Sequence, residues 1–423
     1  MQFFLLFLSV FSLFQRSLND PVPTVDKVHN HDFSSINLST SNFEQINLDF
    51  SKTDWSALVE CSVEDFPKIF NNKVFSILAS HSKISSFNSN QSFKSIFQRK
   101  LNTINRKIRK HRKRFYSTTD QLRKQSIDKK ITLLQTQKKQ LIFNEKYSQE
   151  VKAINRIKND SKFFFKYVNR FKQNISSPNI LIDKNGNTIT DSQSIANLLQ
   201  DQFKSVFSTY QENNVEAILS DFPVINSSLP ELVITNEDII RAIDEMKMSA
   251  SAPCHAIPAR VFKECKNTLC VPLRLFWQKS FDSGIIPSIY KEQIIVPLHK
   301  QGPKTNAANF RPIVLSPHDV KIFERVLRSK LYSFLETNHI LNPNQHGFRR
   351  GLSCTTQLLA HTYNILCNSV ESTDTDCIYL DYSKAFDKVD HVILLKKLQQ
   401  YNITGKYYVW IKNFLKDRTQ TVF

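Results

Sequence analysis

A run of dense positive charge between Lys94 and Lys130 constrains this chain most. It holds 14 Lys and Arg residues against two Asp residues, and few helix breakers interrupt the stretch up to Phe171. Apolar residues in this stretch recur three, four or seven positions apart, the spacing of one helix face. They are Leu101, Ile104, Ile108, Ile127, Ile131, Leu134 and Leu141. The sequence therefore predicts two or three long amphipathic helices in antiparallel arrangement.

The basic run carries the larger part of a strong charge excess. Lys and Arg outnumber Asp and Glu 57 to 38, giving a net charge of +19. Such an excess favours a polyanionic partner, and nucleic acid before a membrane. We expect phosphate contacts from a group of closely spaced cations, namely Arg106, Arg109, Lys110, Arg112, Lys113 and Arg114. The alternative is a helical bundle with a solvated basic face and no partner.

Beyond residue 176 the pattern changes to shorter elements. Asn185-Gly186 lies between apolar β-formers and predicts a hairpin, because a type I′ turn needs positive φ at both central residues. Short strands are predicted at 294–298 and 311–315, and a long helix at 320–334. A later helix begins near Ser353, and we expect its side chains Leu359, Tyr363 and Leu366 to point inward.

These elements indicate a helix-heavy α+β protein with a small sheet. We divide it into an apolar N-terminus and linker (1–60), a basic helical region (61–175), a hairpin with helices (176–284) and a C-terminal domain (285–423). Further helices are predicted near 66–75, 191–210, 236–246, 258–281, 390–401 and 406–416.

Cysteine spacing and the N-terminus give weaker signals. The seven cysteines form no C-x-x-C pair, so reduced thiols are predicted, with zinc near Cys265 and Cys270 as the alternative.

Met1–Phe14 is almost wholly apolar but lacks a preceding Lys or Arg and a clear cleavage site. We expect a buried segment in an intracellular protein, nuclear or cytoplasmic, without a membrane partner. A secreted protein is the alternative.

The run from Ile378 to Asp387 carries the chemistry. Its apolar start predicts a buried strand that ends at Asp381. The bulky ring of Phe386 follows five residues later. A carboxylate in such a place suits a divalent metal held against a nucleoside triphosphate. Upstream, the predicted strand–loop–strand 294–315 carries Lys300, Lys304 and Arg311, which could neutralise phosphates.

Three ordered motifs resemble the reverse transcriptases of non-LTR (LINE-type) retrotransposons. They are Asn309-Phe310-Arg311-Pro312-Ile313, Gln345-His346-Gly347-Phe348-Arg349 with Ser353, and the segment from Tyr379-Leu380-Asp381 to His391. The likeness is strong over about 285–423 and looser over 30–284. It implies a basic helical arm followed by the fingers and first part of the palm of a right-hand polymerase.

The resemblance also implies roles for single residues. Asp381 would be the catalytic carboxylate and a ligand of Mg²⁺, and Phe386 would sense the sugar. Lys384 and Ala385 would offer backbone donors to the triphosphate, which Lys300 and Arg311 would also contact. Template contacts would come from one loop, through Gln345, Gly347, Phe348 and Arg349. The implied partners are an RNA template, a DNA primer and deoxynucleoside triphosphates.

Two departures from the family pattern concern activity. The family's Gly-Pro-Asp-Gly segment is replaced by Pro253-Cys254-His255-Ala256, and no Asp-Asp dipeptide occurs in the 423 residues. The Asp-Asp pair would complete the metal site, so we expect an incomplete and inactive copy of a reverse transcriptase. The alternative is a non-enzymatic RNA- or DNA-binding protein derived from such an element.

Overall fold

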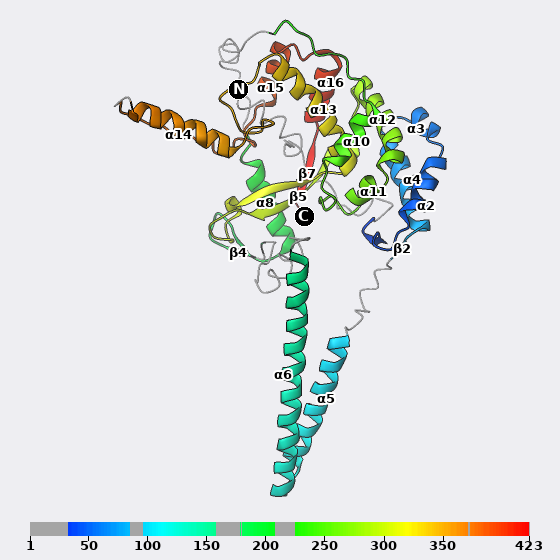
Figure 1. Ribbon diagram of the computed structural model, residues 1–423, viewed down its shortest axis with the longest axis vertical. Helices are drawn as coiled ribbons and strands as arrows, with labels where there is room; N and C mark the ends of the chain where they lie inside the picture. Colours follow the sequence, from blue (N-terminus) through cyan, green and yellow to red (C-terminus); the bar gives the residue numbers. More distant parts are fainter. Residues whose placement is uncertain are drawn as a thin grey trace. The chain divides into compact units, whose positions relative to one another are not determined.

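The computed structural model describes residues 33–84, 96–157, 178, 180–207, 225–370 and 373–422. The chain divides into two compact units (Figure 1). One comprises residues 86–176 and contains the helices α5 and α6, which we call the basic hairpin. The other comprises residues 1–85 and 177–423, and we call it the main unit.

The main unit is a mixed, helix-rich structure with small sheets, which confirms the predicted α+β class. Its helices are α2 (Phe43–Lys52), α3 (Ser56–Glu60), α4 (Phe66–Ser80), α8 (Ser192–Lys204), α10 (Asn236–Asp244), α11 (Ala259–Glu264), α12 (Lys266–Ser283), α13 (His318–Thr337), α14 (Cys354–Val370), α15 (His391–Gln400) and α16 (Gly405–Leu415). Its strands are β1 (Ile36–Asn37), β2 (Lys83–Ile84), β3 (Leu181–Ile182), β4 (Thr188–Ile189), β5 (Glu292–His299), β6 (Phe310–Leu315) and β7 (Thr419–Val422).

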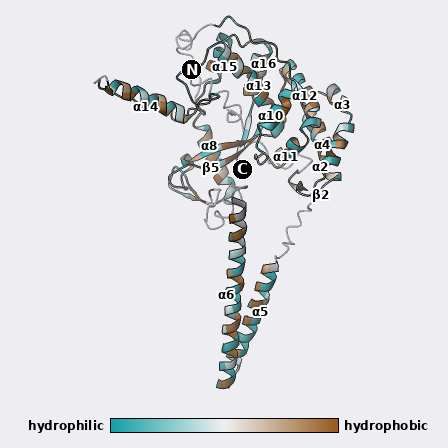
Figure 2. Cartoon of the chain, in the orientation of Figure 1, coloured by the Kyte–Doolittle hydropathy of each residue, from teal (hydrophilic) through white to brown (hydrophobic). Residues whose placement is uncertain are grey.

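The basic hairpin consists of α5 (Ile96–Ser117) and α6 (Gln121–Ile157), as the sequence predicts. Residues of both helices that are buried or half-buried recur at spacings of three and four, the seam of an antiparallel coiled coil. On α5 they are Leu101, Ile104, Ile108, His111 and Phe115, and on α6 they are Ile127, Ile131, Leu134, Lys138 and Leu141. Teal and brown residues alternate along both helices (Figure 2). The seam therefore leaves all nine cations of α5 on its outer faces, whereas Lys138 of α6 lies in the seam.

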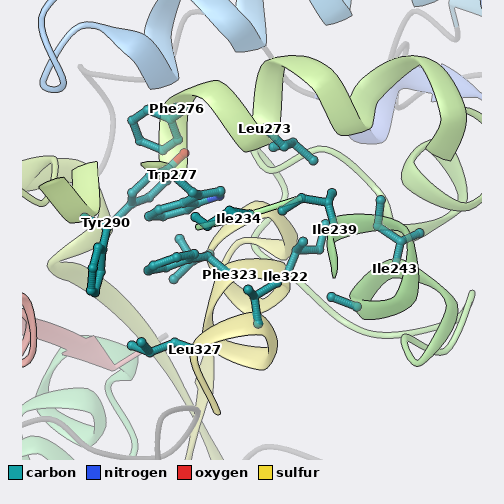
Figure 3. Packing of buried hydrophobic residues seen from close by; sticks show 14 of the residues in the cluster. Ile234, Ile239, Ile243, Leu273, Phe276, Trp277, Tyr290, Ile322, Phe323 and Leu327 are labelled. Atoms are coloured by element: carbon teal, nitrogen blue, oxygen red, sulfur yellow. The ribbon is translucent and has the colours of Figure 1, made fainter. Parts of the chain in front are cut away.

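The core of the main unit is organised around α12 and α13. The rings of Trp277 on α12 and Phe323 on α13 stack with centroids 4.6 Å apart and planes only 4° from parallel. Tyr290 packs against Trp277 from the segment after α12, and Ile239 and Ile243 approach from α10 (Figure 3). Because α12 also contacts α3 and α16, it buries more than one face.

Gly284 ends α12 in the left-handed conformation, with φ of 69°. A Cβ atom added there would lie 2.7 Å from Cγ1 of Val409 on α16. Glycine is therefore required at this point both by the backbone and by the close approach of α16.

Residues 43–60 belong to this core. The sequence predicts a linker with short helices, and α2 and α3 are indeed short. However, Ile46, Phe50 and Leu58 are all 2% exposed or less and pack in the same apolar cluster as α12 and α13. Helix α2 has only ten residues, so its apolar positions repeat too few times for the sequence to predict which face is buried.

The three-stranded sheet has the order β6-β5-β7, with β5 antiparallel to β6 and parallel to β7. One face is covered by α8, where Leu199 and Phe203 pack with Ile295 and Phe310 in a second apolar cluster. The predicted strands β5 and β6 are confirmed, as is the β3–β4 hairpin around Asn185-Gly186. Its turn is not the predicted type I′, because Gly186 has a positive φ of 84° whereas Asn185 does not, and residues 183–187 form a longer loop. The strand β7 was not predicted.

The aromatic stack between α12 and α13 gives a first prediction. Replacing Phe323, which is fully buried, with alanine should lower the free energy of unfolding of the main unit by about 3–5 kcal/mol. Urea unfolding followed by Trp fluorescence measures this unit, because Trp55, Trp277 and Trp410 all belong to it. Tyr363→Ala is the matched control: its ring is 68% exposed, so the loss should stay below about 0.5 kcal/mol. Equal losses would contradict the assigned core.

Candidate active site

The face of the three-stranded sheet opposite α8 carries the exposed apolar side chains of Val296 and Leu298, the cation Arg311 and, at the start of β5, the acid Glu292. Side chains of β5 alternate, so that Ile295 points to the α8 side while Val296 and Leu298 point away from it. Leu298 pairs with Arg311 of β6, and both side chains are exposed. Paired residues share a face, so the guanidinium of Arg311 lies at the edge of a small apolar platform.

The loop between β5 and β6 carries two further exposed cations, Lys300 and Lys304. The loop is held by its own hydrogen bonds: Asn309 donates from its backbone N–H to Asn306 O at 3.1 Å and from its side-chain amide to Pro303 O at 2.9 Å. Lys300 N–H donates to Asn309 O, also at 2.9 Å. Among the described residues, neither lysine nor Arg311 forms an ion pair, so all three charges face solvent.

The segment after α13 forms a tightly held loop at residues 345–351. Arg349 donates to both carboxylate oxygens of Glu336 on α13, at 3.0 and 2.7 Å, and to Asn342 O at 2.9 Å. This pairing lowers the pKa of Glu336 and raises that of Arg349. Gln345 is half-buried, whereas Gly347 and Phe348 are exposed.

The segment preceding Asp381 is not a strand in the structure. Ile378, Tyr379 and Leu380 are 84%, 79% and 87% exposed, and no described strand pairs with them. A three-residue apolar run becomes a strand only when a neighbouring strand satisfies its backbone groups. Asp381 is consequently an exposed residue of an irregular segment, which corrects the expectation of a buried strand with an acid at its tip.

Helix α14 forms where it was predicted, but the prediction that its apolar side chains point inward is wrong. None of its residues is buried, and Leu359, Tyr363 and Leu366 are 59–68% exposed. The helical spacing identified one apolar face correctly, yet no described element covers that face.

Phe386 is brought into contact with the 345–351 loop. Its ring meets the ring of Phe348 edge to face, with centroids 6.2 Å apart, and it is partly buried against the main core. The turn before it contains Lys384 in the left-handed conformation, with φ of 51°, and Ala385 is half-buried. Two of the predicted motifs therefore meet through an aromatic pair.

The acids that follow have other roles. Burial raises the pKa of Asp387, although the charge of Lys384 partly opposes this. Asp390 caps α15 by accepting hydrogen bonds from the backbone N–H groups of Val392 and Ile393 at 2.7 and 3.1 Å.

The six cations of the basic run that were predicted to contact nucleic-acid phosphates all lie on α5. This helix carries nine Lys and Arg residues and no Asp or Glu. Its 22 residues correspond to a length of about 33 Å, comparable to about ten base steps of duplex DNA. In the basic hairpin, Arg106, Arg109, Lys110, Arg112, Lys113 and Arg114 are exposed and form no ion pair with described residues.

Comparison with known proteins decides the family. Residues 299–423, which include Lys300, Arg311, the 345–351 loop and Asp381, match the family described as reverse transcriptase (RNA-dependent DNA polymerase). Residues 299–423 are a reverse transcriptase domain.

Relatives of this reverse transcriptase domain come from mobile elements of Drosophila melanogaster. The chain is 27% identical over 224 residues to the probable RNA-directed DNA polymerase from transposon BS, covering 53% of the chain and 25% of that protein. It is 33% identical over 134 residues to the probable polymerase from transposon X-element, covering 31% of the chain and 14% of the relative. The RNA-directed DNA polymerase from mobile element jockey is 26% identical over 194 residues, covering 45% of the chain and 21% of that protein. The chain thus spans a quarter or less of the length of these relatives.

Reverse transcriptases use divalent metal ions such as Mg²⁺, and the residues present can be tested against that need. In the described part of the chain, no group of three or more His, Cys, Asp and Glu side chains gathers where a metal could bind. Asp381 supplies one exposed carboxylate, Asp387 is half-buried and Asp390 is occupied as a helix cap. This donor set does not fit a complete two-metal centre.

Two residues of the site escaped sequence reasoning. Glu336 and Tyr332 anchor the 345–351 loop, and the Tyr332 hydroxyl donates to Glu336 Oε1 at 2.5 Å. Their spacing of four on a predicted helix was a usable signal that they share a face. Nothing local indicated that Arg349 would pair with them.

Among the described helices, none is both long and apolar enough to cross a membrane.

The exposed segment before Asp381 gives a second prediction. Leu380→Lys should change the free energy of unfolding of the main unit by less than about 0.5 kcal/mol, because the side chain is 87% exposed. The same change at Ile295, which is 1% exposed in β5, should prevent folding or cost more than about 4 kcal/mol. Urea unfolding measures both variants. A large loss from Leu380→Lys would mean that this segment is buried after all.

Proposed function

We propose that this chain provides the fingers and first part of the palm of an RNA-directed DNA polymerase of a non-LTR retrotransposon. The match of residues 299–423 to reverse transcriptases carries the proposal. The fingers would comprise the β6-β5-β7 sheet, and the palm would begin with α14 and the segment around Asp381. The substrates would be an RNA template, a DNA primer and deoxynucleoside triphosphates.

The nucleotide side of the site rests on charge and exposure. Lys300 and Arg311 are exposed and free of described carboxylates, so they remain available for a triphosphate. Arg311 lies beside the apolar surface of Leu298 and Val296, on which a base could rest. Asp381 would face the reacting phosphate, with Lys384 and Ala385 supplying backbone donors nearby and Phe386 meeting the sugar.

The basic hairpin would hold the nucleic acid through its backbone. Nine cations without an acid on α5 form a positive ridge, and such a ridge binds phosphates with little sequence preference. The coiled-coil seam keeps the ridge straight, so binding should not need folding of the helix on contact.

The polypeptide of residues 1–423 should not extend a primer by itself. Nucleotidyl transfer uses two metal ions held by carboxylates, and Asp381 is a single exposed carboxylate here. The irregular, uncovered segment Ile378–Leu380 supports the same conclusion, because a catalytic acid must be held within a fraction of an ångström.

Nucleic-acid binding is tested by neutralising part of the α5 ridge. In Arg109→Gln/Arg112→Gln/Lys113→Gln, the slope of log affinity against log salt for a labelled RNA–DNA hybrid should fall by about 2–3, since each of the three lost contacts removes about 0.7–0.9. Fluorescence anisotropy over a KCl series measures it.

The matched control neutralises three exposed lysines of the main unit, Lys52, Lys68 and Lys412, and should leave the slope almost unchanged. Asp381→Ala should also bind normally. Equal losses in the α5 variant and the lysine control would show that only net charge matters and would remove the binding role from the hairpin.

Primer extension tests the catalytic statement. Purified chain incubated with a primed RNA template, deoxynucleoside triphosphates and Mg²⁺ should give no product above that of the Asp381→Ala variant. Product that disappears in Asp381→Ala would contradict it and would require a second carboxylate near Asp381.

A further inference from the structure

Two adjacent arginines at the end of the 345–351 loop have opposite environments. Arg349 uses three nitrogens, two on Glu336 and one on Asn342 O, and its side chain is only 15% exposed. A guanidinium in a bidentate carboxylate pair has its charge balanced and its planar edge occupied. It could reach a phosphate only by giving up that pair.

Arg350 is exposed and has no carboxylate partner among the described residues. Its guanidinium carbon lies 5.6 Å from the centre of the Tyr332 ring, and its backbone N–H donates to the Tyr332 hydroxyl at 3.0 Å. A guanidinium over an aromatic face keeps its N–H edges directed outward, where they can bind another anion.

Tyr332 connects the two arginines. Its hydroxyl donates to Glu336 Oε1, which in turn accepts from Arg349 Nε, while the same hydroxyl accepts from the backbone of Arg350. The position of Arg350 therefore depends on the Glu336–Arg349 pair through one shared oxygen network.

Other contacts fix the remainder of the loop. His346 Nδ1 lies 2.7 Å from Thr356 Oγ1, and Thr356 exchanges hydrogen bonds with Ser353 at the start of α14. Phe348 has φ of 63°, a conformation that is rare for a bulky residue and persists only when the surroundings hold it. The loop is thus a preformed surface whose exposed residues are Gly347, Phe348, Arg350 and Gly351, and Arg350 carries its only exposed charge among the described residues.

We propose that Arg350 is the phosphate-binding cation of this loop and that Arg349 is a positioning residue, which locks the loop to α13 through Glu336. The inference rests on the proposed function, since it assigns the residues by which the reverse transcriptase domain holds its nucleic acid. It replaces the expectation that Arg349 contacts the template directly.

Glu336→Gln separates the two roles, because it frees Arg349 without changing its charge. If Arg349 acts by locking the loop, Glu336→Gln and Arg349→Gln should weaken binding to a similar extent, and the double variant should be no weaker than either. If Arg349 binds phosphate itself, Glu336→Gln should leave binding unchanged or strengthen it, which would overturn the proposal.

Arg350→Gln supplies the second readout. It should lower the salt slope by about one, whereas its melting temperature should match that of the unmodified chain. Binding of the full 423-residue chain to a labelled RNA–DNA hybrid with a single-stranded RNA overhang measures each variant over a KCl series. An unchanged slope in Arg350→Gln would also overturn the proposal.

The matched control is Glu231→Gln, which removes one acid from an exposed ion pair with Lys406 elsewhere in the main unit. It should not weaken binding. Failure of the unmodified chain to bind the hybrid would instead count against the proposed function. Normal binding by the unmodified chain, with either contrary result above, would count against this inference alone.

Discussion

The stack of Trp277 on Phe323 holds α12 against α13, and the geometry of the site depends on α13. The strand β6 with Arg311 leads directly into α13, and the 345–351 loop follows its end. Near that end, Glu336 and Tyr332 point out from the helix and fix Arg349 and Arg350. One well-packed helix therefore sets the relation between the cationic sheet edge and the loop that meets Phe386.

Local patterns predicted the elements whose stability is local. The three-and-four spacing of α5, α6 and α13 and the hairpin around Asn185-Gly186 were confirmed. Each depends on residues only a few positions apart. The family resemblance was also confirmed. It depends on motifs whose residues lie close together in the sequence.

The predictions that failed depend on partners distant in sequence. Ile378–Leu380 has strand-forming residues but no described strand beside it, and α14 has an apolar face but no described cover. Conversely, the strand β7 contains two threonines and a glutamine, and it forms because β5 offers a free edge. Arg349 and Glu336 pair across 13 residues of sequence, and neither the helical spacing nor a turn motif indicates this pair.

Charge is distributed to suit a nucleic-acid partner at two places. The basic hairpin offers a long ridge without acids, and the main unit offers a few separate cations around a preformed loop. A ridge of this kind gives affinity with little selectivity, whereas single cations on a rigid scaffold determine register. The two units would therefore contribute differently to holding a template and primer.

Hydrogen exchange of the full chain, with and without an RNA–DNA hybrid, tests most directly whether these surfaces bind nucleic acid. With the hybrid bound, we expect slower exchange in α5, in the β5–β6 loop at 300–309 and in the loop at 345–351, with α2 and α4 unchanged. Protection confined to other parts of the chain, or none at a concentration of hybrid that saturates binding, would contradict it.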